Sequence, residues 1–367
     1  MRIVLTGGGT GGHIYPAVAV GKHMLQNDPD TKLLFIGTQN GMESRVVPGQ
    51  NIPFEAIEIT GFRRKLSFEN IKTVMRFLKG VQRSKKLLRE FKPDVVVGTG
   101  GYVCGPVVYA AAKLGIPTFI HEQNAIPGLT NQFLSRYADH IGVSFPESAS
   151  QFPKAKAASY TGNPVASNVL KAQPGKGLQS LGLPAGTRFA LIVGGSRGAK
   201  ALNESVIEMA PMLSRLAGAH VVFVTGEIYY ESTKEKIGAS AGNQLTLVPY
   251  LHNMAEVLRD ATLVVSRSGA SSLAEITALG LPSILIPSPN VTNNHQEANA
   301  RSLVKAGAAE LLLEKELSGG KLLSLMEELL GDKARMSAMS AAASKLAVPD
   351  SAERIAEALR RLNNERL

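Results

Sequence analysis

The residues best suited to chemistry form a glycine-rich loop, residues 7–13, with the sequence GGGTGGH. Glycines adopt positive φ angles readily and let backbone N–H groups approach a ligand closely. A helix that begins at such a loop adds its unpaired N–H groups and the positive end of its dipole. His13 closes the loop, and an imidazole that titrates near neutral pH can take a proton from a reacting hydroxyl. The loop is therefore predicted to bind oxyanions or sugar hydroxyls.

Two familiar phosphate-binding loops fit this stretch poorly. A P-loop requires a Lys-Ser/Thr pair after its last glycine, but residues 13–14 are histidine and isoleucine. Gly7, Gly9 and Gly12 do match the dinucleotide pattern G-x-G-x-x-G, which expects an acidic residue about 20 positions later. Residues 36–39, at that place, read IGTQ. A nucleotide-sugar enzyme remains, and it explains why a histidine closes the loop.

Other glycine-rich or polar segments also follow predicted strands directly. They are residues 98–106 (GTGGYVCGP), 121–124 (HEQN) and 194–199 (GGSRGA). In open α/β sheets, ligands bind at the carboxyl ends of the strands, so these segments are candidates for substrate contact. Each loop taken alone is explained equally well as a tight turn.

The rest of the chain predicts the elements that would position these loops. Short β-branched runs alternate with helical patterns, which indicates parallel sheets built from βαβ units. A length of 367 residues suits two domains, and residues 161–164 (TGNP) suit a hinge. The expected strands are 3–6, 33–36, 95–97, 118–120 and 140–143, then 189–193, 221–224, 245–248, 263–265, 283–286 and 309–312.

The expected fold is therefore α/β, with two Rossmann-like domains that face each other across a cleft. Residues 1–162 are predicted to form the first domain and residues 163–348 the second. Residues 349–367 contain a last helix, 351–362, whose amphipathic pattern fits packing against either domain.

Composition argues against several classes of function. The formal net charge of +10 is concentrated in residues 63–92 and 154–200. These segments lack interleaved aromatics and nucleic-acid-binding motifs, so nucleic acid is not an expected partner. The single cysteine, Cys104, excludes an internal disulfide and fits a reducing compartment. Because the chain begins directly on a strand and no apolar run approaches roughly 18 residues, we expect it to be neither secreted nor integral to a membrane.

Residues 68–91 predict a helix with a row of basic residues spaced by fours and threes. Apolar residues fall to one side of this row, at positions 68, 71, 74, 75, 78 and 81. Such a helix could lie on an anionic bilayer, or it could be a core helix with a solvated basic face. The pattern alone does not choose between these interpretations. The basic row consists of Lys72, Arg76, Lys79, Arg83 and Lys86.

Six motifs, in this order along the chain, resemble those of a known family. Together they are similar to the MurG family, the N-acetylglucosaminyltransferases of peptidoglycan precursor synthesis. The resemblance implies the two-domain GT-B glycosyltransferase fold. The motifs are GGTGGH ending at His13, GTGGYVCGP from Gly98, HEQNAIPGLTN from His121, TGNP from Thr161, GGSRGA from Gly194 and SRSGASSLAEI from Ser266.

The resemblance also implies a reaction and its partners. GlcNAc moves from UDP-GlcNAc to the C4 hydroxyl of the MurNAc-pentapeptide of lipid I, the diphospho-undecaprenol-linked acceptor, giving lipid II and UDP with inversion. Residues 1–162 would hold the acceptor, and residues 163–348 would hold UDP-GlcNAc. A lipid-linked acceptor favours a peripheral position on the cytoplasmic face of the membrane, with helix 68–91 on the anionic surface.

Neither a metal nor another cofactor is expected. Helix N-termini would stabilise the departing diphosphate instead of a metal ion. Metal-dependent transferases often carry an Asp-x-Asp pair, and Asp28 and Asp30 are so spaced. They follow the first predicted helix, at the edge away from the glycine loops, so they are predicted to form a turn.

Carried over residue by residue, the resemblance implies a site. His13 and Glu122 are both candidates for the catalytic base, and the resemblance does not choose between them. Gly100, Gly101 and Tyr102 form a loop that is a candidate for acceptor contact. The residues expected to bind UDP-GlcNAc are Thr10, Gly11, Gly12, Asn124, Ser196, Leu251, Ser268, Gly269, Ala270, Ser271, Glu275, His295, Gln296 and Asn299.

Two positions depart from the family's pattern. Some members carry an arginine within two residues of the GNP turn, where it contacts the nucleotide, but this chain has Val165 and Ala166. Arg197 is a candidate to compensate. The position of His295 is often glutamine.

Two other functions stay open. A soluble UDP-sugar epimerase shares the two-domain architecture but needs neither a lipid acceptor nor a basic membrane face. A non-catalytic nucleotide-sugar binding module would tolerate the loss of His13 and Glu122 together. Product analysis separates the transferase from the epimerase, because an epimerase changes UDP-GlcNAc without an acceptor.

Overall fold

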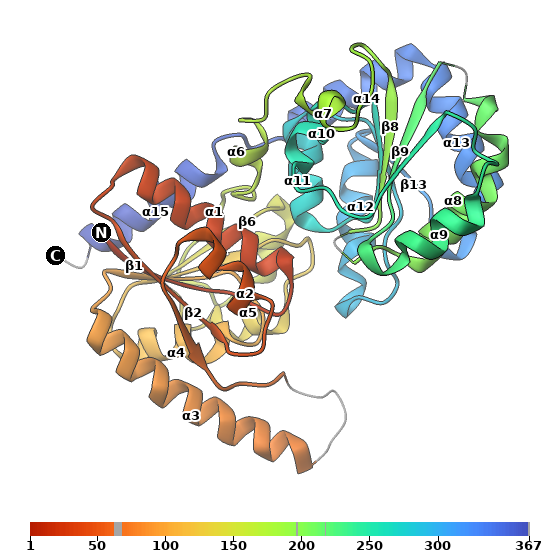
Figure 1. The fold of residues 1–367 in the computed structure, drawn as a ribbon. Coiled ribbons are helices and arrows are strands. Elements are labelled where there is room, and N and C mark those ends of the chain that lie inside the picture. The colour runs from red at the N-terminus through yellow and green to blue at the C-terminus, as the bar shows by residue number, and fades with distance from the viewer. Residues whose placement is uncertain (62–67, 196, 217, 366–367) are drawn as a thin grey trace. The chain divides into compact units, whose positions relative to one another are not determined.

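The computed structural model describes residues 1–61, 68–195, 197–216 and 218–365. The chain folds into two compact units, which are described separately (Figure 1). Unit 1 contains Met1–Ala166 and Asp350–Leu367, and unit 2 contains Ser167–Pro349. The chain therefore leaves unit 1 just beyond the predicted TGNP hinge, and its last segment returns to unit 1.

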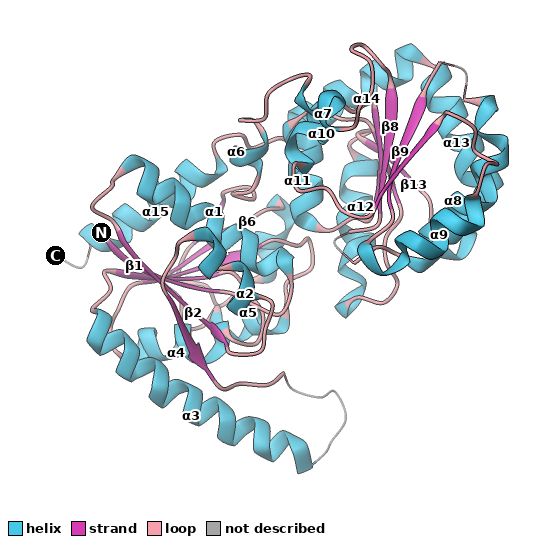
Figure 2. Ribbon diagram, viewed as in Figure 1, coloured by secondary structure: helices cyan, strands magenta, loops and turns pink. Residues whose placement is uncertain are grey.

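Unit 1 is built around a seven-stranded parallel sheet with the order β3-β2-β1-β4-β5-β6-β7 (Figure 2). Its central strands are continuous apolar runs because helices cover both faces of such a sheet. Ile3, Val4 and Leu5 in β1 are all fully buried. The strands are β1 (Arg2–Thr6), β2 (Lys32–Thr38), β3 (Phe54–Ile57), β4 (Val95–Gly98), β5 (Thr118–Glu122), β6 (His140–Val143) and β7 (Ala158–Tyr160).

The pattern predicted the five inner strands of this sheet and missed its two edge strands. Both β3, with the sequence FEAI, and β7, with the sequence ASY, are short and half-exposed. An edge strand is not covered as fully as an inner one, so it needs no continuous apolar run. The sequence signal used for the inner strands was therefore absent.

Helices pack on both faces of the sheet of unit 1. On one face, α1 and the C-terminal α15 share a core with Ile3 and Val97, into which α15 contributes Ile355 and Leu359. On the other face, α3 lies along α4 (Figure 1). The helices are α1 (Gly11–Asn27), α2 (Glu43–Val46), α3 (Phe68–Phe91), α4 (Cys104–Lys113), α5 (Leu129–Leu134) and α15 (Ser351–Asn364), with 3-10 turns η1 (Pro48–Gln50) and η2 (Pro146–Gln151).

Unit 2 contains a six-stranded parallel sheet with the order β10-β9-β8-β11-β12-β13. All six strands were predicted, which confirms an α/β fold with two parallel-sheet domains. The strands are β8 (Phe189–Val193), β9 (His220–Val224), β10 (Leu245–Val248), β11 (Leu263–Ser266), β12 (Ser283–Leu285) and β13 (Ala309–Leu311).

The helices of unit 2 also lie on both sides of its sheet (Figure 2). The preceding α6 (Ala166–Val169) begins at the boundary between the units. The others are α7 (Lys176–Ser180), α8 (Lys200–Met209), α9 (Tyr230–Ile237), α10 (Met254–Asp260), α11 (Ala270–Ala278), α12 (His295–Lys305), α13 (Gly319–Gly331) and α14 (Lys333–Leu346), with 3-10 turns η3 (Ala210–Arg215), η4 (Glu227–Tyr229), η5 (Thr292–Asn294) and η6 (Glu314–Glu316).

Strand order fixes where ligands can bind. In each sheet the first strand of the unit is central, and the order reverses between β1 and β4 and between β8 and β11. Ligands of open α/β sheets bind outside the carboxyl ends of the strands at such a reversal. The glycine loops after β1, β4 and β8 and the turn after β11 all begin there. None of the described helices is both long and apolar enough to span a bilayer.

Candidate active site

His13 lies in the first turn of α1, at the end of the first glycine loop. Its Nδ1 is 3.0 Å from the carbonyl oxygen of Gly8 and 3.4 Å from the hydroxyl of Thr10. A carbonyl can only accept, so Nδ1 carries the proton in this contact. In the neutral imidazole the basic nitrogen is then Nε2. Thr10 is the N-cap of α1, Gly11 and Gly12 begin the helix, and all three residues are at least partly exposed.

The first glycine loop, residues 7–13, packs directly on the glycine-rich loop of residues 98–106. The N–H of Gly8 donates to the carbonyl of Gly100 at 3.3 Å. Gly100 and Gly101 have φ angles of 104° and 81°. A Cβ on Gly100 would lie 2.8 Å from His13 Cδ2, and one on Gly101 would lie 2.3 Å from the Gly8 oxygen. Only glycine fits here, so the candidate acceptor loop, which continues into the exposed Tyr102, lies beside His13.

Glu122, the other candidate for the catalytic base, is buried, and both of its carboxylate oxygens accept hydrogen bonds. Its Oε1 accepts from the backbone N–H of Asn124 at 3.0 Å and from the Asn124 side chain at 3.3 Å. Its Oε2 accepts from the N–H of Gly128 at 3.0 Å and from the side chain of Asn131 at 2.9 Å. Four donors on one carboxylate make it the centre of the turn between β5 and α5. It positions Asn124, a predicted donor-binding residue.

His121 is unsuited to be a base, although it stands next to Glu122. Its Nε2 donates to the carbonyl of Gly162 at 2.8 Å, and the amide of Gln123 donates to its Nδ1 at 3.1 Å. Burial lowers the pKa of His121 to about 4, because desolvation disfavours the charged imidazolium. It therefore remains neutral and joins β5 to the turn at Gly162.

Unit 2 contains a cavity of about 500 Å³ at the carboxyl ends of β8 and β11. Of the residues predicted to bind the donor, Gly269 and Gln296 line it. Ser196 lies outside the described residues. The lining consists of Val193, Gly194, Gly195, Gly198, Ala199, Lys200, Ala201, Tyr229, Ser266, Arg267, Gly269, Ser272, Ser288, Asn290, Val291, Gln296 and Glu314.

Buried polar residues tie the segments around this cavity together. Ser268 donates from its hydroxyl to the carbonyl of Gln296 at 2.7 Å, and the Asn299 side chain donates to the carbonyl of Ser268 at 3.1 Å. The N–H of Ser288 donates to the Gln296 side chain at 2.8 Å. Ser268 and Asn299 are fully buried. They therefore hold the start of α12 against the turn before α11 rather than line the cavity.

The remaining predicted donor residues lie outside the lining of this cavity. Ala270 is the buried first residue of α11, and Leu251 is buried after β10. The Ser271 hydroxyl is buried and has no hydrogen-bond partner among the described residues. His295 Nδ1 donates to the carbonyl of Thr292 at 2.7 Å, within the turn that opens α12.

Glu275 follows in α11 and is only partly exposed. Among the residues that the structure describes, none donates a hydrogen bond to its carboxylate. Burial raises the pKa of the Glu275 carboxyl to about 7, because desolvation disfavours the ionised form. Such a carboxylate is suited to accept hydrogen bonds from hydroxyls that a ligand brings.

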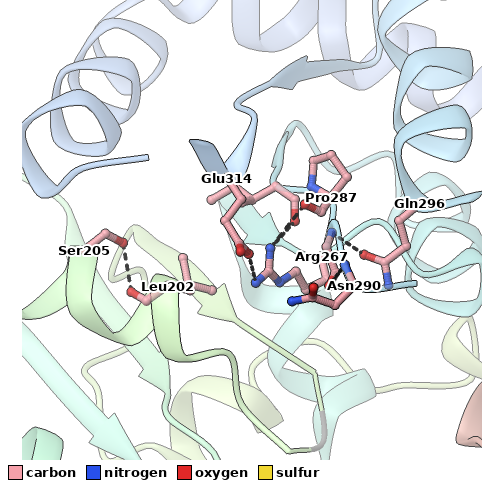
Figure 3. A network of polar contacts seen from close by, with 9 residues as sticks. Leu202, Ser205, Arg267, Pro287, Asn290, Gln296 and Glu314 are labelled. Atoms are coloured by element: carbon pink, nitrogen blue, oxygen red, sulfur yellow. Dashed lines mark hydrogen bonds and ion pairs between the residues drawn. The ribbon is translucent and has the colours of Figure 1, made fainter. Parts of the chain in front are cut away.

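Sequence reasoning missed Arg267 and Glu314 (Figure 3). Arg267 donates to the carbonyls of Ile286 and Pro287 at 3.1 and 3.3 Å and forms an ion pair with Glu314. Their side chains are 13% and 22% exposed, and both line the cavity. Arg267 stands inside the SRSG motif, so its position was a usable signal. Glu314 follows β13 and carries no motif of its own.

The basic row of α3 is exposed at all five positions, Lys72, Arg76, Lys79, Arg83 and Lys86. Beside it, Val74, Met75 and Leu78 are 45%, 55% and 57% exposed. Val81, in contrast, is buried and packs in the core with α4. The apolar residues predicted for one side of the helix therefore include both exposed and buried members. Leu129 and Phe133 of α5 are exposed apolar residues as well, and the ring of Phe133 packs against Phe77 of α3.

Two family descriptions match the chain in sequence. The glycosyltransferase family 28 N-terminal domain matches residues 3–143, and the glycosyltransferase family 28 C-terminal domain matches residues 189–355. Each match covers the sheet of one unit and its glycine loops. The fold and these matches define the class of the protein as a family 28 glycosyltransferase.

Full-length relatives narrow the class. A UDP-N-acetylglucosamine--N-acetylmuramyl-(pentapeptide) pyrophosphoryl-undecaprenol N-acetylglucosamine transferase of Bacillus cytotoxicus is 52% identical, and one of Bacillus thuringiensis is 51% identical, with 99% of each chain covered. The crystal structure of Acinetobacter baumannii MurG is similar with a TM-score of 0.78 and 30% identity, covering 98% of this chain and 99% of that one. The chain belongs to the MurG family of N-acetylglucosaminyltransferases.

A structural likeness also extends to epimerases. A putative UDP-N-acetylglucosamine 2-epimerase from Listeria monocytogenes has a TM-score of 0.74 at 15% identity, covering 99% of this chain and 97% of that one. This likeness shows a shared fold alone. It leaves the assignment to the transferase family unchanged.

Proposed function

We propose that this chain transfers GlcNAc from UDP-GlcNAc to the muramoyl-pentapeptide of lipid I, releasing lipid II and UDP. The activity follows from its membership in the MurG family. The observation that carries the mechanism is the hydrogen bond from His13 Nδ1 to the Gly8 carbonyl. It leaves Nε2 as the atom that can accept a proton.

His13 is the base in this proposal. Its Nε2 takes the proton of the acceptor's C4 hydroxyl as that oxygen forms a bond to the anomeric carbon of GlcNAc. The bond from the anomeric carbon to the UDP oxygen breaks with inversion, and UDP leaves with the bonding electron pair. Gly100, Gly101 and Tyr102 support the acceptor beside His13, since their loop packs on the first glycine loop.

The donor occupies the cavity of unit 2. The backbone N–H groups at the starts of α8 and α11, with Gly194, Gly195 and Gly269, bind the diphosphate and stabilise it as it departs. Gln296 lines this cavity and can donate to and accept from sugar hydroxyls. Ser268 and Asn299 position Gln296, and Glu275 accepts from the ribose. Thr10, Gly11, Gly12 and Asn124 remain predicted donor-binding residues.

We further propose that the protein binds peripherally to the cytoplasmic face of the membrane through α3. Exposed Val74, Met75 and Leu78 stand beside the exposed basic row. This combination suits an interface in which apolar side chains enter the headgroup region while basic side chains meet anionic lipids.

The mechanism is tested by transfer of labelled GlcNAc to a lipid I analogue in the presence of EDTA. His13→Ala should lower kcat by roughly 10²- to 10⁴-fold, the usual contribution of a general base, while UDP binding persists. Glu122→Gln should keep most of kcat but lower Tm, because its new NH₂ group must oppose a donor and cost about 1–3 kcal/mol.

The opposite pattern, with activity lost in folded Glu122→Gln and retained in His13→Ala, would assign the base to Glu122. Incubation of UDP-GlcNAc without any acceptor is the control for epimerase activity. Conversion of the sugar nucleotide under that condition, without transfer to lipid I, would contradict the proposed reaction.

A further inference from the structure

A buried carboxylate that the proposed mechanism does not use lies beneath the first glycine loop. Glu43, the first residue of α2, is completely buried. Its Oε1 accepts from the backbone N–H of Thr38 at 3.1 Å and from the Thr38 hydroxyl at 2.6 Å. Its Oε2 accepts from the backbone N–H of Gly9 at 3.2 Å. All three contacts are donors to the carboxylate, as an ionised side chain requires.

Three glycines leave the space that Glu43 occupies. A Cβ on Gly8 would lie 2.5 Å from Glu43 Oε1, one on Gly37 would lie 2.7 Å from Glu43 Cγ, and one on Gly41 would lie 2.3 Å from Oε1. These glycines come from the loop after β1, from β2 and from the turn before α2. The carboxylate is therefore held from several sides and fixed against the loop.

The geometry connects Glu43 to His13 through a single peptide group. The N–H of Gly9 and the C=O of Gly8 belong to the same peptide unit, so the unit donates to Glu43 at one end and accepts from His13 Nδ1 at the other. Hydrogen bonds in such a chain polarise one another and strengthen. A negative carboxylate at the N–H end makes the carbonyl oxygen at the other end a better acceptor.

We propose that Glu43 is a positioning residue that acts through the Gly8–Gly9 peptide to hold His13 in the Nδ1-protonated tautomer. The inference rests on the proposed role of His13 as the base. The carboxylate also stabilises the imidazolium that forms when Nε2 takes the acceptor's proton, in the way that a carboxylate bonded directly to histidine does in hydrolytic triads. Glu43 itself does not gain a proton. Here a peptide group stands between the carboxylate and the imidazole.

The decisive variant is Glu43→Gln, which keeps the shape but loses the charge. The NH₂ group of the variant side chain must then face a backbone N–H donor, either that of Gly9 or that of Thr38. Asp139→Asn is the matched control, because Asp139 also accepts from a backbone N–H and a hydroxyl of one threonine, Thr118, at 2.9 and 3.0 Å. Among the described residues, the side chain of Asp139 contacts Thr118 and Lys156 through its hydrogen bonds and ion pair, and neither residue belongs to a glycine loop.

We expect Glu43→Gln to lower kcat about tenfold, within the range of couplings in one hydrogen-bond network, with KM for both substrates within about twofold. The same change in a His13→Ala background should cost less than about twofold, because the coupling runs through His13. Asp139→Asn should leave kcat within about twofold of wild type in both backgrounds. An unchanged kcat in Glu43→Gln, or an equal loss in both backgrounds, would overturn the proposal.

Nitrogen NMR of His13 provides a readout independent of turnover, and its wild-type measurement does not depend on the folding of any variant. In the wild-type chain the neutral imidazole should carry its proton on Nδ1, and in Glu43→Gln the Nε2-protonated form should become populated. A wild-type His13 protonated at Nε2 would overturn the relay. Wild-type turnover in His13→Ala would instead contradict the proposed base, and the NMR result would still decide whether Glu43 sets the tautomer.

Discussion

At the scale of single residues, the local environment distinguishes titratable side chains that the sequence alone does not distinguish as candidates for the base. His13 lies in the first turn of α1, and His121 and Glu122 are the last two residues of β5. His121 has both ring nitrogens in buried hydrogen bonds, and Glu122 has four donors. His13 is bonded to a carbonyl through Nδ1 and stands in a partly exposed turn. That difference favours His13 as the base.

Glu275 makes stability depend on pH. Its pKa is raised by burial from 4.5 to about 7, so the unfolded state ionises first as pH rises between these values. The free energy of unfolding therefore falls from pH 4.5 to 7 and stays reduced above pH 7. Glu275→Gln removes the cost of burying an ionised carboxylate. The variant should therefore be more stable than wild type by about 1–3 kcal/mol at pH 8, with a smaller difference at pH 5.

Thermal unfolding at pH 5 and pH 8 checks this prediction. Saturating UDP is the second condition, because a ribose hydroxyl that donates to the carboxylate would stabilise its ionised form. The gain of the variant at pH 8 should then shrink. A difference in Tm that does not change with pH would contradict burial as the cause of the raised pKa.

At the scale of elements, α3 has one face that packs in the core of unit 1 and another that is exposed. Thr73, Val81, Ser84, Leu87 and Leu88 are buried, and the helix lies against α4. The basic row and Val74, Met75 and Leu78 remain exposed. Arg83 also pairs with Glu55 at 3.0 Å, so part of its charge is already compensated. Lys86 pairs with Glu90 at 3.9 Å. Among the side chains that the structure describes, the basic charge without an acidic partner is therefore concentrated toward the N-terminal half of the row.

Replacing Lys72, Arg76 and Lys79 by glutamine should weaken binding to anionic vesicles strongly. Each basic residue near the surface contributes on the order of 1 kcal/mol, so the three together contribute about 3 kcal/mol, or roughly a hundredfold in affinity. Vesicle sedimentation at fixed ionic strength measures the loss. Donor binding should not change, because none of the three substituted residues lines the donor cavity.

A triple variant with the same net charge tests whether position matters. Lys236, Lys305 and Lys333 are exposed on helices of unit 2, and their replacement by glutamine should reduce vesicle binding much less. Equal losses in the two triple variants would show a non-specific charge effect and would contradict docking through α3.

At the scale of the whole molecule, the chain crosses from unit 1 to unit 2 and returns. The returning helix, α15, completes unit 1, since Ile355 and Leu359 are fully buried in a core with α1 and the sheet. The N-terminal unit therefore depends on residues that follow the whole of unit 2 in the sequence. A fragment ending at Ala166 would expose this apolar face of α1.

Leu359→Ala should destabilise unit 1 by about 2–5 kcal/mol, the usual cost of such a cavity. Calorimetry that resolves two transitions should show one lowered and the other unchanged, because the two units have separate cores. Glu357→Ala, at an exposed position of the same helix, is the control and should leave both transitions in place. A uniform shift of both transitions would contradict the assignment of α15 to unit 1.

The sequence by itself determined the parts of the structure that depend on local physics. Continuous apolar runs marked the inner strands, because a strand covered on both faces needs apolar residues at every position. Glycine loops after strands marked the ligand-binding edges, because strand order places them there. The order of six motifs determined the family. The edge strands of unit 1, β3 and β7, lacked the apolar signal and were missed.

Tertiary structure decided which residues of each motif meet. Gly8 is distant in the sequence from Gly37 and Glu43, and the three share no periodic pattern, yet they form one buried cluster. Glu314 reaches Arg267 from another strand end in the same way. The hydrogen bond that sets the tautomer of His13, and those that occupy the carboxylate of Glu122, exist only after the loops have packed. Spacing along the chain predicts which elements form, and packing between them determines which side chains are available for chemistry.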